Sequence, residues 1–438
     1  MTTMRHITLA SLALVLTLAP ALGAQPGSTI ARRVAAARDG QVRLSYATRA
    51  DVCGDGRDGV SIGRSMTFFD RGESYGSWGR TRCVDGPARV ELTVQDRKVV
   101  GVRTRVGGAW SSGASDVTDL GRVSAPEAAA YFISLAQQID GGSRQNPLLA
   151  AAVADSANVA PDMLRLARMT NLSRETRRRA VHWAGALGDA SMVAPLTELA
   201  RASGNEGTSA DDVGPGNGVA GAAVGALGMI PDGAGVPALM TLARSGSESV
   251  RKAAVFWLGQ RDEEKAHALV RTVAGDDKET DAVRRAAIFA LSQGEGASAA
   301  DFAFLRSLFD RVSSDRLKEQ VLFSVSQHES WDGTRWLLDQ ARDESQPMEV
   351  RRKAVFWAGQ GHASVADISS LYKSAKDARL REHVIFVLSQ RDEEAATTQL
   401  LSIAREDPDR EMRKKALFWL AQKNDPRVTK LITDMVIR

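Results

Sequence analysis

Histidine and carboxylate side chains are present that could support catalysis, but their spacing matches no catalytic or metal-binding motif. The sequence contains no HExxH zinc motif, nucleophile elbow, phosphate-binding loop or paired-cysteine metal motif. Asp51, Asp55 and Asp58 do not have the spacing of a calcium-binding EF-hand loop, and a turn rich in glycine and aspartate is the simpler interpretation. The histidines after residue 180 are scattered: His182, His267, His328, His362 and His383. The sequence therefore predicts no enzyme, no cofactor and no metal ion.

Phenylalanine and glutamine recur instead at a spacing that suits non-covalent recognition. A block of eleven residues occurs six times between residues 250 and 422, with phenylalanine at position 7 and glutamine at position 11 of every copy. These positions are about one helical turn apart, so the two columns lie side by side on one helix face. The columns comprise Phe256, Phe289, Phe323, Phe356, Phe386 and Phe418, and Gln260, Gln293, Gln327, Gln360, Gln390 and Gln422.

Two interpretations of these columns are open. In the first, they line a binding groove on a concave face, where the rings hold side chains of an extended peptide and the amides bond its backbone. In the second, each ring packs between successive helices and each amide bonds a neighbouring repeat. Small residues at position 10, such as Gly259 and Ser292, favour close helix approach and hence packing. Tryptophans at position 8, such as Trp257 and Trp357, are interpreted as large core residues with small residues opposite.

The elements that position these columns follow from the repeat period. The closing glutamines lie 33, 34, 33, 30 and 32 residues apart, a period typical of a solenoid of helical pairs. Each repeat of such an array contacts only its neighbours, so the molecule offers an extended surface rather than a central pocket. The predicted fold is mainly α.

The repeats resemble the short HEAT repeats of bilin-lyase-like proteins over about residues 146–438. The matching features are inner helices that begin Val-Arg, as at Val250 and Val350, an acidic residue in the following turn, and an outer helix after it. The resemblance implies a right-handed α–α superhelix, an armadillo-like solenoid whose inner helices line the concave face. It also implies that a basic column at position 2 pairs with the turn acids of neighbouring repeats. The column comprises Arg251, Arg284, Lys318, Arg351, Arg381 and Arg413, and the turn acids are Asp262, Glu295, Glu329 and Asp392.

The N-terminal residues 1–24 have the pattern of a secretory signal peptide. Arg5 supplies the positive charge, residues 7–19 the apolar core, and small residues at 21–24 a cleavage site. No later stretch approaches the ~20 apolar residues that a membrane span requires. We therefore expect an exported protein, either periplasmic or secreted.

The only two cysteines, Cys53 and Cys83, are expected to form a disulfide, because an exported protein meets an oxidising compartment. They fall in a predicted small β-rich module, residues 41–120, which contains a hairpin at Gln95–Lys98. Residues 25–40 before it form a short helix or a flexible segment. The helical array, residues 124–438, opens with a predicted capping box at Ser124 and Glu127.

The net charge of +4 is too small for a dedicated nucleic-acid binder, so no nucleic acid is expected. The favoured function is a non-enzymatic scaffold that binds a protein or peptide on the concave face. Two alternatives stay open: a bilin-lyase-like enzyme or enzyme subunit, which only the resemblance suggests, and a binder of an anionic polymer through the basic rim. The identity of the partner, the role of the β-rich module and the oligomeric state do not follow from the sequence.

Overall fold

The computed structural model describes most of the chain between residues 29 and 429. The predicted signal peptide, residues 1–24, lies outside the described residues. The chain forms two compact units, Met1–Val159 and Ala160–Arg438, while the predicted limits of the β-rich module and of the repeat array stay predictions. The described residues are 29–57, 59–62, 66–69, 72–75, 83–110, 117–139, 147–203, 216, 218–293, 298–327, 331–423, 425 and 427–429.

The first unit contains a four-stranded sheet whose strands alternate buried apolar residues with more exposed polar ones. This alternation suits a sheet with one covered face. The strand order is β7-β6-β1-β8, with β8 parallel to β1 and the other neighbours antiparallel. The strands are β1 (Gly40–Tyr46), β6 (Ala88–Gln95), β7 (Lys98–Val106) and β8 (Val117–Arg122).

A two-residue turn joins β6 to β7, as the sequence predicted. Gln95 pairs with Lys98, and Asp96 and Arg97 between them have φ angles of 49° and 59°. Two successive residues with positive φ are typical of the type I′ turn, which suits the twist of a hairpin. The Asp39 carboxylate accepts hydrogen bonds from the backbone N–H groups of Asp96 (2.9 Å) and Arg97 (3.2 Å). Asp39 therefore supports a turn that contains no glycine.

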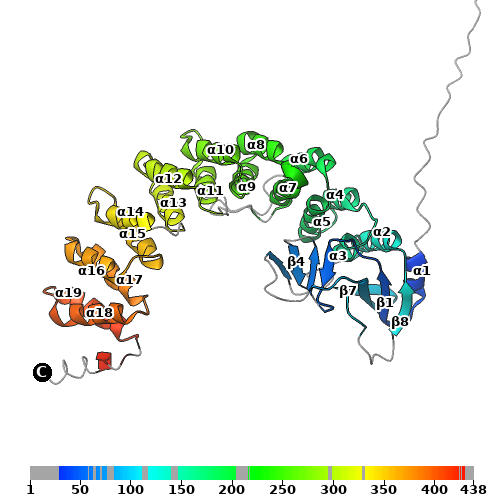
Figure 1. The fold of residues 1–438 in the computed structure, drawn as a ribbon, viewed down its shortest axis with the longest axis horizontal. Helices are drawn as coiled ribbons and strands as arrows, with labels where there is room; N and C mark the ends of the chain where they lie inside the picture. Colours follow the sequence, from blue (N-terminus) through cyan, green and yellow to red (C-terminus); the bar gives the residue numbers. More distant parts are fainter. Residues whose placement is uncertain are drawn as a thin grey trace, which may run out of the picture. The chain divides into compact units, whose positions relative to one another are not determined.

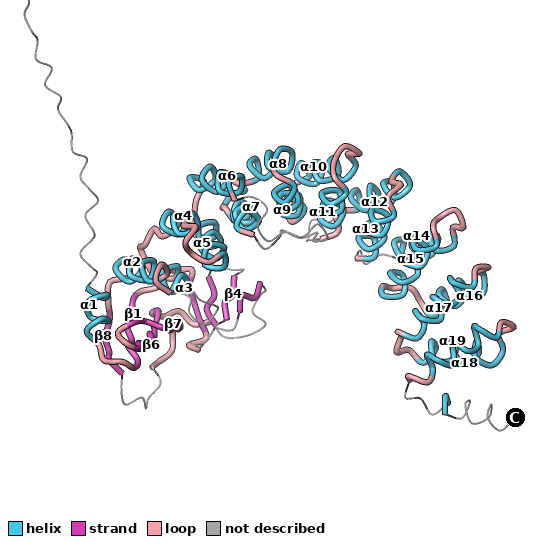
Figure 2. The backbone as a smooth tube through the Cα atoms, turned by 180° about the vertical axis from the view of Figure 1, so that it is seen from behind, coloured by secondary structure: helices cyan, strands magenta, loops and turns pink. Residues whose placement is uncertain are grey.

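Three helices pack with this sheet in the first unit: α1 (Thr29–Ala36), α2 (Ala125–Leu135) and α3 (Pro147–Ala152). Tyr46 of β1 is fully buried, and its ring centroid lies 6.1 Å from that of Phe132 in α2. Its hydroxyl donates a 2.6 Å hydrogen bond to the carbonyl oxygen of Ala150 in α3. Tyr46 thus connects the apolar face of the sheet to both helices. Figure 2 shows α2 and α3 beside this sheet.

The predicted capping box at the start of α2 is wrong. Ser124 is the N-cap residue, but its side chain makes no capping hydrogen bond. Glu127 instead accepts a 3.2 Å hydrogen bond from the backbone N–H of Ile30, in the first turn of α1. Backbone N–H groups in the first turn of a helix have no partner within that helix. Glu127 therefore provides a hydrogen-bond acceptor for the first turn of α1 rather than for the first turn of its own helix.

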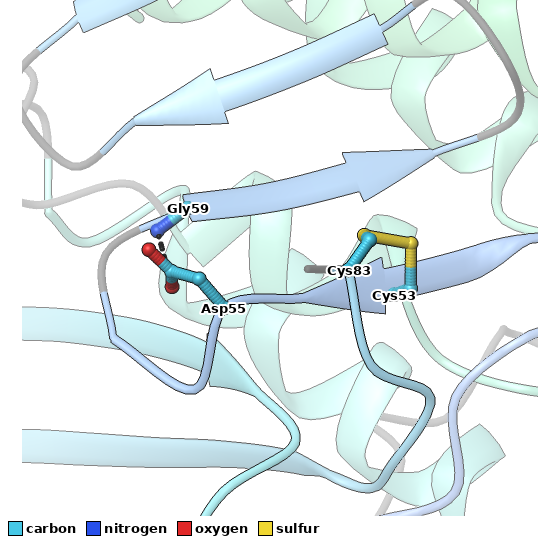
Figure 3. The surroundings of a disulfide bond; sticks show 4 residues. All are labelled: Cys53, Asp55, Gly59 and Cys83. Carbon is cyan, nitrogen blue, oxygen red and sulfur yellow. Dashed lines mark hydrogen bonds between the residues drawn. A yellow bond between two sulfur atoms is a disulfide. The ribbon is translucent and has the colours of Figure 1, made fainter. Parts of the chain in front are cut away.

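A second, smaller sheet carries the disulfide. Cys53 and Cys83 are bonded, with 5.4 Å between their Cα atoms, so the predicted disulfide is confirmed. Beside it, the Asp55 carboxylate accepts a 3.0 Å hydrogen bond from the backbone N–H of Gly59 (Figure 3). It also accepts a 2.7 Å hydrogen bond from the backbone N–H of Arg57, as a tight turn requires. The sheet has the order β2-β3-β4-β5, with strands β2 (Val52–Gly54), β3 (Gly59–Ile62), β4 (Met66–Phe69) and β5 (Gly72–Tyr75).

The second unit is a row of helical hairpins in two layers, which confirms the predicted solenoid of helical pairs. Figure 1 shows the odd-numbered helices from α7 to α17 along the concave side of this unit. We call the odd-numbered helices the inner layer: α5 (Arg174–Ala186), α7 (Val219–Met229), α9 (Glu248–Gly259), α11 (Asp281–Ala290), α13 (Asp315–Ser326), α15 (Met348–Gln360), α17 (Ala378–Ser389) and α19 (Arg410–Leu420). The outer layer comprises α4 (Ala160–Arg168), α6 (Val193–Ala202), α8 (Val236–Ser245), α10 (Glu264–Gly275), α12 (Ala299–Arg311), α14 (Trp331–Arg342), α16 (Val365–Ser374) and α18 (Glu394–Glu406).

Glycine at position 10 allows successive inner helices to approach closely. A Cβ atom on Gly259 of α9 would lie 2.6 Å from the carbonyl oxygen of Ala290 in α11. On Gly359 of α15, it would lie 2.2 Å from Cγ1 of Val387 in α17. Neither distance leaves room for a side chain, because real Cβ contacts are rarely below 3.0 Å. The predicted role of small residues at position 10 is confirmed at these two contacts.

The basic residues at position 2 are structural, but the predicted acidic partners are wrong where the structure describes them. Arg251 pairs with Glu279 (2.8 Å) and Arg381 with Asp407 (2.6 Å), and both acids lie between an outer helix and the next inner helix. Position 2 is at the start of the inner helix, whereas the turn acids follow its end, about 16 Å away at 1.5 Å per residue. Of those acids, Asp262 and Asp392 are exposed, and Glu295 and Glu329 lie outside the described residues.

Two position-2 arginines also stabilise the end of the preceding outer helix. Each donates from Nε to a carbonyl oxygen ten residues earlier, in the last turn of that helix, where carbonyl groups have no partner within the helix. A cation is also favoured there by the helix dipole. The donor–acceptor pairs are Arg284–Ala274 (3.1 Å) and Arg351–Ala341 (3.0 Å). Arg177 near the start of α5 makes the same contact with Ala167 (3.0 Å), although α5 precedes the six copies.

We predict that Arg351→Met destabilises the helical unit by about 2 kcal/mol, because a charge-assisted hydrogen bond is lost and the Ala341 carbonyl is left unsatisfied. The matched control is Arg352→Met, which removes the same charge from the adjacent residue. Arg352 is more exposed and forms its ion pair with Glu349 on its own helix, so that change should cost less than about 1 kcal/mol. Urea unfolding followed by circular dichroism measures both. Equal losses would show that Arg351 does not stabilise the helix end.

Candidate functional site

The six phenylalanines of position 7 all lie on the inner layer, one on each helix from α9 to α19. Five of them are half-buried, and Phe418 on the last inner helix has 60% of its surface exposed. No phenylalanine of the column belongs to the closed core between the two layers. The side chains therefore form a partly accessible row, which we call the aromatic row.

Three rings of the aromatic row stack directly on one another. The centroids of Phe256 and Phe289 are 6.3 Å apart with 14° between the ring planes. Those of Phe289 and Phe323 are 6.0 Å apart with 13° between the planes. Each stack joins two successive inner helices. These rings therefore pack between repeats, as one of the two interpretations requires, and each also keeps part of its surface accessible.

Tryptophan at position 8 continues the row where it is present. Trp357 of α15 lies edge-on to Phe323 of α13 with 4.8 Å between ring centroids, and Trp419 of α19 lies 5.3 Å from Phe386 of α17. Where position 8 is small, as at Ala290 in α11, the phenylalanine of that helix makes the contact instead. At four of the five junctions from α9 to α19, one aromatic ring thus meets the position-7 ring of the preceding helix. At the junction between α15 and α17, position 8 is Val387, and Phe356 contacts Trp357 of its own helix.

The sequence interpretation of these tryptophans needs correction. Trp257 does lie opposite small residues, because a Cβ atom on Gly225 of α7 would come within 3.0 Å of its ring. However, Trp257, Trp357 and Trp419 are all half-buried rather than core residues. Their alternation with small residues at position 8 was the available signal that they share one row with the phenylalanines.

The glutamines of position 11 lie at or just beyond the C-terminal ends of the inner helices. Gln260 and Gln293 are half-buried, and the other four are exposed. The amides of Gln293, Gln327 and Gln390 donate to the preceding serine at 3.2–3.4 Å. Within the described part of the chain, none of these amides has a hydrogen bond to another repeat. The amide nitrogen of Gln260 is buried there without any acceptor.

Paired charges flank the row one turn towards the helix N-termini. Glu319 at position 3 of α13 lies 3.6 Å from Lys353 at position 4 of α15. The same positions pair Glu382 of α17 with Lys415 of α19 at 2.6 Å. The charges at these two junctions cancel. A partner that contacts the row there would meet an apolar surface with a neutral border.

The junction between α15 and α17 lacks this ion pair. Arg352 occupies the position of the acid, and His383 occupies that of the lysine. Burial, together with the positive charge of Arg352, lowers the pKa of His383 to about 4. The Nε2 atom of His383 is buried and has no hydrogen-bond partner among the described residues. The folded protein therefore favours the neutral imidazole at this junction.

His267, another of the scattered histidines, belongs to a structural network of the outer layer. Its Nδ1 lies 2.7 Å from the Asp301 carboxylate of α12, and its Nε2 lies 2.6 Å from the backbone carbonyl of Arg261. Both side chains are almost fully buried. Asp301 also accepts hydrogen bonds from Ser298 and from Arg271. With both ring nitrogens occupied by structural partners, this group joins α10 to α12.

Membrane-spanning helices and metal-binding clusters are both absent from the described residues. No helix there combines the length and apolar character that a membrane crossing needs. In the same part of the chain, no three histidine, cysteine, aspartate or glutamate side chains lie together in a way that could hold a metal ion.

Residues 217–325 and 334–421 match the family profile of HEAT repeats. The resemblance inferred from the sequence is thereby confirmed, and these residues consist of HEAT repeats. A search of curated proteins found no match.

Solved structures with similar helical repeats share little sequence with this chain. The CpcE–CpcF complex of phycocyanin lyase from Nostoc sp. PCC7120 has 16% identity, covers 55% of this chain and 92% of its own, and has a TM-score of 0.29. Human deoxyhypusine hydroxylase has 18% identity, coverages of 56% and 89%, and a TM-score of 0.24. A designed armadillo repeat protein in complex with the peptide (KR)4 has 14% identity, coverages of 60% and 98%, and a TM-score of 0.25. These values support no conclusion about activity.

We predict that His383 makes the stability of the helical unit depend on pH. A histidine in the unfolded chain has a pKa of about 6.5, whereas the pKa of His383 in the folded protein is about 4. As the pH falls, His383 is therefore protonated in the unfolded chain before it is protonated in the folded protein. The contribution is therefore fully present above pH ~6.5 and is lost as the pH falls towards 4. Allowing for solvent screening of a partly exposed ring, the loss should be about 1–2 kcal/mol.

Urea unfolding of the wild type and of His383→Gln at several pH values between 7 and 4 measures this contribution. Between pH 7 and pH 4, the free energy of unfolding of the variant should fall by about 1–2 kcal/mol less than that of the wild type. If the two proteins show the same pH dependence, protonation of His383 does not affect this junction.

Proposed function

We propose that the helical unit is a non-enzymatic scaffold that binds an extended segment of a partner protein along the aromatic row. The observation that carries this proposal is the continuous contact from Phe256 through Phe289 and Phe323 to Trp357, with every ring half-buried. The rings meet across helix junctions and keep part of their surface available to a partner. Aromatic residues are enriched in protein interfaces because they supply large contact areas.

The spacing of the rings suits an extended polypeptide. Successive rings in the stack are 6.3 and 6.0 Å apart. Two residues of a β-strand span about 6.6 Å, and alternate side chains of a strand point to the same face. Alternate side chains of a bound segment would therefore meet successive rings. A helical partner, with 1.5 Å per residue, would not follow the row in this regular register.

The glutamines beside the row suit the backbone of such a segment. An extended chain outside a sheet has unpaired N–H and C=O groups at every residue. A glutamine amide can both donate and accept hydrogen bonds. Gln327, Gln360, Gln390 and Gln422 are exposed, and the described amide bonds run only to the adjacent serine. Exchanging that weak local bond for one to a ligand would leave no buried group unsatisfied.

The charge distribution favours a protein segment over an anionic polymer. The lysines at position 4 of α15 and α19 are already paired with glutamates of the preceding inner helices. Arg352 likewise pairs with Glu349 on its own helix. Binding of an anionic polymer depends on phosphate or sulfate contacts to unpaired cations. An apolar partner segment matches the neutral row better.

The scaffold is proposed to act outside the cytoplasm, in the periplasm or after secretion. Residues 1–24 have the charge, apolar length and small-residue end of a secretory signal. The disulfide between Cys53 and Cys83 is of a kind that persists in oxidising compartments. Both observations support the proposal independently of the repeats.

The test is peptide selection from a phage-displayed random library by the immobilised full chain, followed by measurement of Kd. We expect selected peptides with apolar residues at alternate positions. Replacing Gln293, Gln327 and Gln360 together by alanine should weaken binding at least about tenfold, because each lost hydrogen bond is worth about 1 kcal/mol. The melting temperature should change little, since these amides make only local bonds.

The matched control replaces Gln340 of α14 and Gln399 of α18, which lie on the outer layer, by alanine. That variant should bind like the wild type. If no peptide is selected, or if the inner and outer variants bind equally well, the aromatic row is not the binding surface.

A further inference from the structure

One face of the four-stranded sheet in the first unit carries a cluster of arginines. In the register of the sheet, Arg43 of β1 lies opposite Glu91 of β6, and Glu91 lies opposite Arg103 of β7. The adjacent register row places Ser45 opposite Arg89, and Arg89 opposite Arg105. Residues directly opposite each other, and residues two apart on one strand, share a face. Four arginine side chains therefore lie on the same face of the sheet.

Arg89 is the most deeply buried of the four, with 4% of its surface exposed. It donates to the carbonyl oxygens of Gly107 (2.7 Å), Ala109 and Gly56 (2.7 Å). These bonds join β6 to the turn after β7 and to the disulfide-bearing sheet. All three acceptors are neutral, so the hydrogen bonds are satisfied but the positive charge is not compensated. A buried charge without a counter-charge is costly.

Arg105 lies directly opposite Arg89 and adds a second positive charge at this place. Burial, and then the charge of Arg105, lower the pKa of Arg89 from its ordinary value. Among the residues that the structure describes, Arg105 has no acidic partner, although it is half-buried. Like charges directly opposite each other on neighbouring strands destabilise a sheet. This pair therefore costs stability in the absence of an anion.

Arg43 and Trp110 complete the cluster. The guanidinium carbons of Arg43 and Arg89 lie 5.2 and 5.3 Å from the centroid of the Trp110 ring, so a cation–π contact holds each of them. The Nε atom of Arg43 is buried and has no hydrogen-bond acceptor within the described part of the chain. Its nearest acid, Asp119, is 3.9 Å away and more than half exposed. Arg43 therefore has an unused donor beside the arginine pair.

Among the residues that the structure describes, the acids on this face do not balance the cluster. Glu91 and Asp119 provide two negative charges for the guanidinium groups of Arg43, Arg89, Arg103 and Arg105. Within this described group, the positive charges exceed the negative charges by two. Guanidinium groups bind the planar or tetrahedral oxygens of carboxylate, phosphate and sulfate groups through paired hydrogen bonds.

We propose that this arginine cluster binds a small oxyanion, in the form of a carboxylate, phosphate or sulfate group, between Arg43 and Arg105 beside Trp110. The bound anion compensates the charges of Arg89 and Arg105 and accepts the unused hydrogen bond of Arg43. This site is separate from the aromatic row, and it gives the first unit a ligand-binding role of its own.

The test is isothermal titration of the full chain with inorganic phosphate, sulfate and acetate in separate experiments at low ionic strength. The anion with the lowest Kd identifies the preferred chemical group. Arg105→Gln should weaken its binding at least about tenfold, as expected for loss of one charge-assisted contact. The control Lys98→Gln removes the same charge from an exposed residue of the same strand, and it should change Kd less than about twofold.

Thermal unfolding separates a binding role from a structural one. Without the anion, Arg105→Gln should unfold at the same or a higher temperature than the wild type, because the repulsion with Arg89 is removed. With the anion, only the wild type and Lys98→Gln should gain stability. The proposal is overturned if none of the three anions binds at millimolar concentration, or if Arg105→Gln and Lys98→Gln weaken binding equally. It is also overturned if Arg105→Gln destabilises the protein without any anion.

Discussion

The helical unit depends on the contact between each inner helix and the next. A hairpin of two short helices cannot bury its apolar faces alone, so every repeat requires its neighbours. At the junction of α9 and α11, the contact combines stacked rings at position 7 with a small residue at position 10. Gly259 lets the two helices approach closely, and the rings of Phe256 and Phe289 stack at the same junction. A larger residue at position 10 there would separate the helices and their rings.

The same contact explains why a packing residue can also form a surface. The rings of Phe256, Phe289 and Phe323 stack across their junctions and are only half-buried, so part of each ring stays accessible. Because the rings already pack against one another in the free protein, a partner would not have to order them. Preorganisation of this kind reduces the entropic cost of binding. The two interpretations of the phenylalanine column are thus compatible.

The repeat period, the inner helices and the disulfide could all be predicted, because each depends on residues that are close in sequence or on cysteine number. The partners of individual side chains could not. Helical spacing shows that Arg351 is at the start of its helix, but it does not show that the Ala341 carbonyl lies beside it. Glu127 likewise fits a capping box by sequence, yet it bonds the N–H of Ile30 in another helix. The role of Arg89 could not be predicted from the sequence, because it depends on strand register and on the position of a distant turn.

The change Phe289→Ala tests most directly whether the position-7 rings hold successive inner helices together. Phe289 stacks on rings of both neighbouring helices, whereas Phe418 has the same position on the last inner helix and is 60% exposed. Urea unfolding followed by circular dichroism should show a loss of about 2–4 kcal/mol for Phe289→Ala, as for a large apolar residue in a packed environment. Phe418→Ala should lose less than about 1 kcal/mol. Equal losses in the two variants would contradict this account of the array.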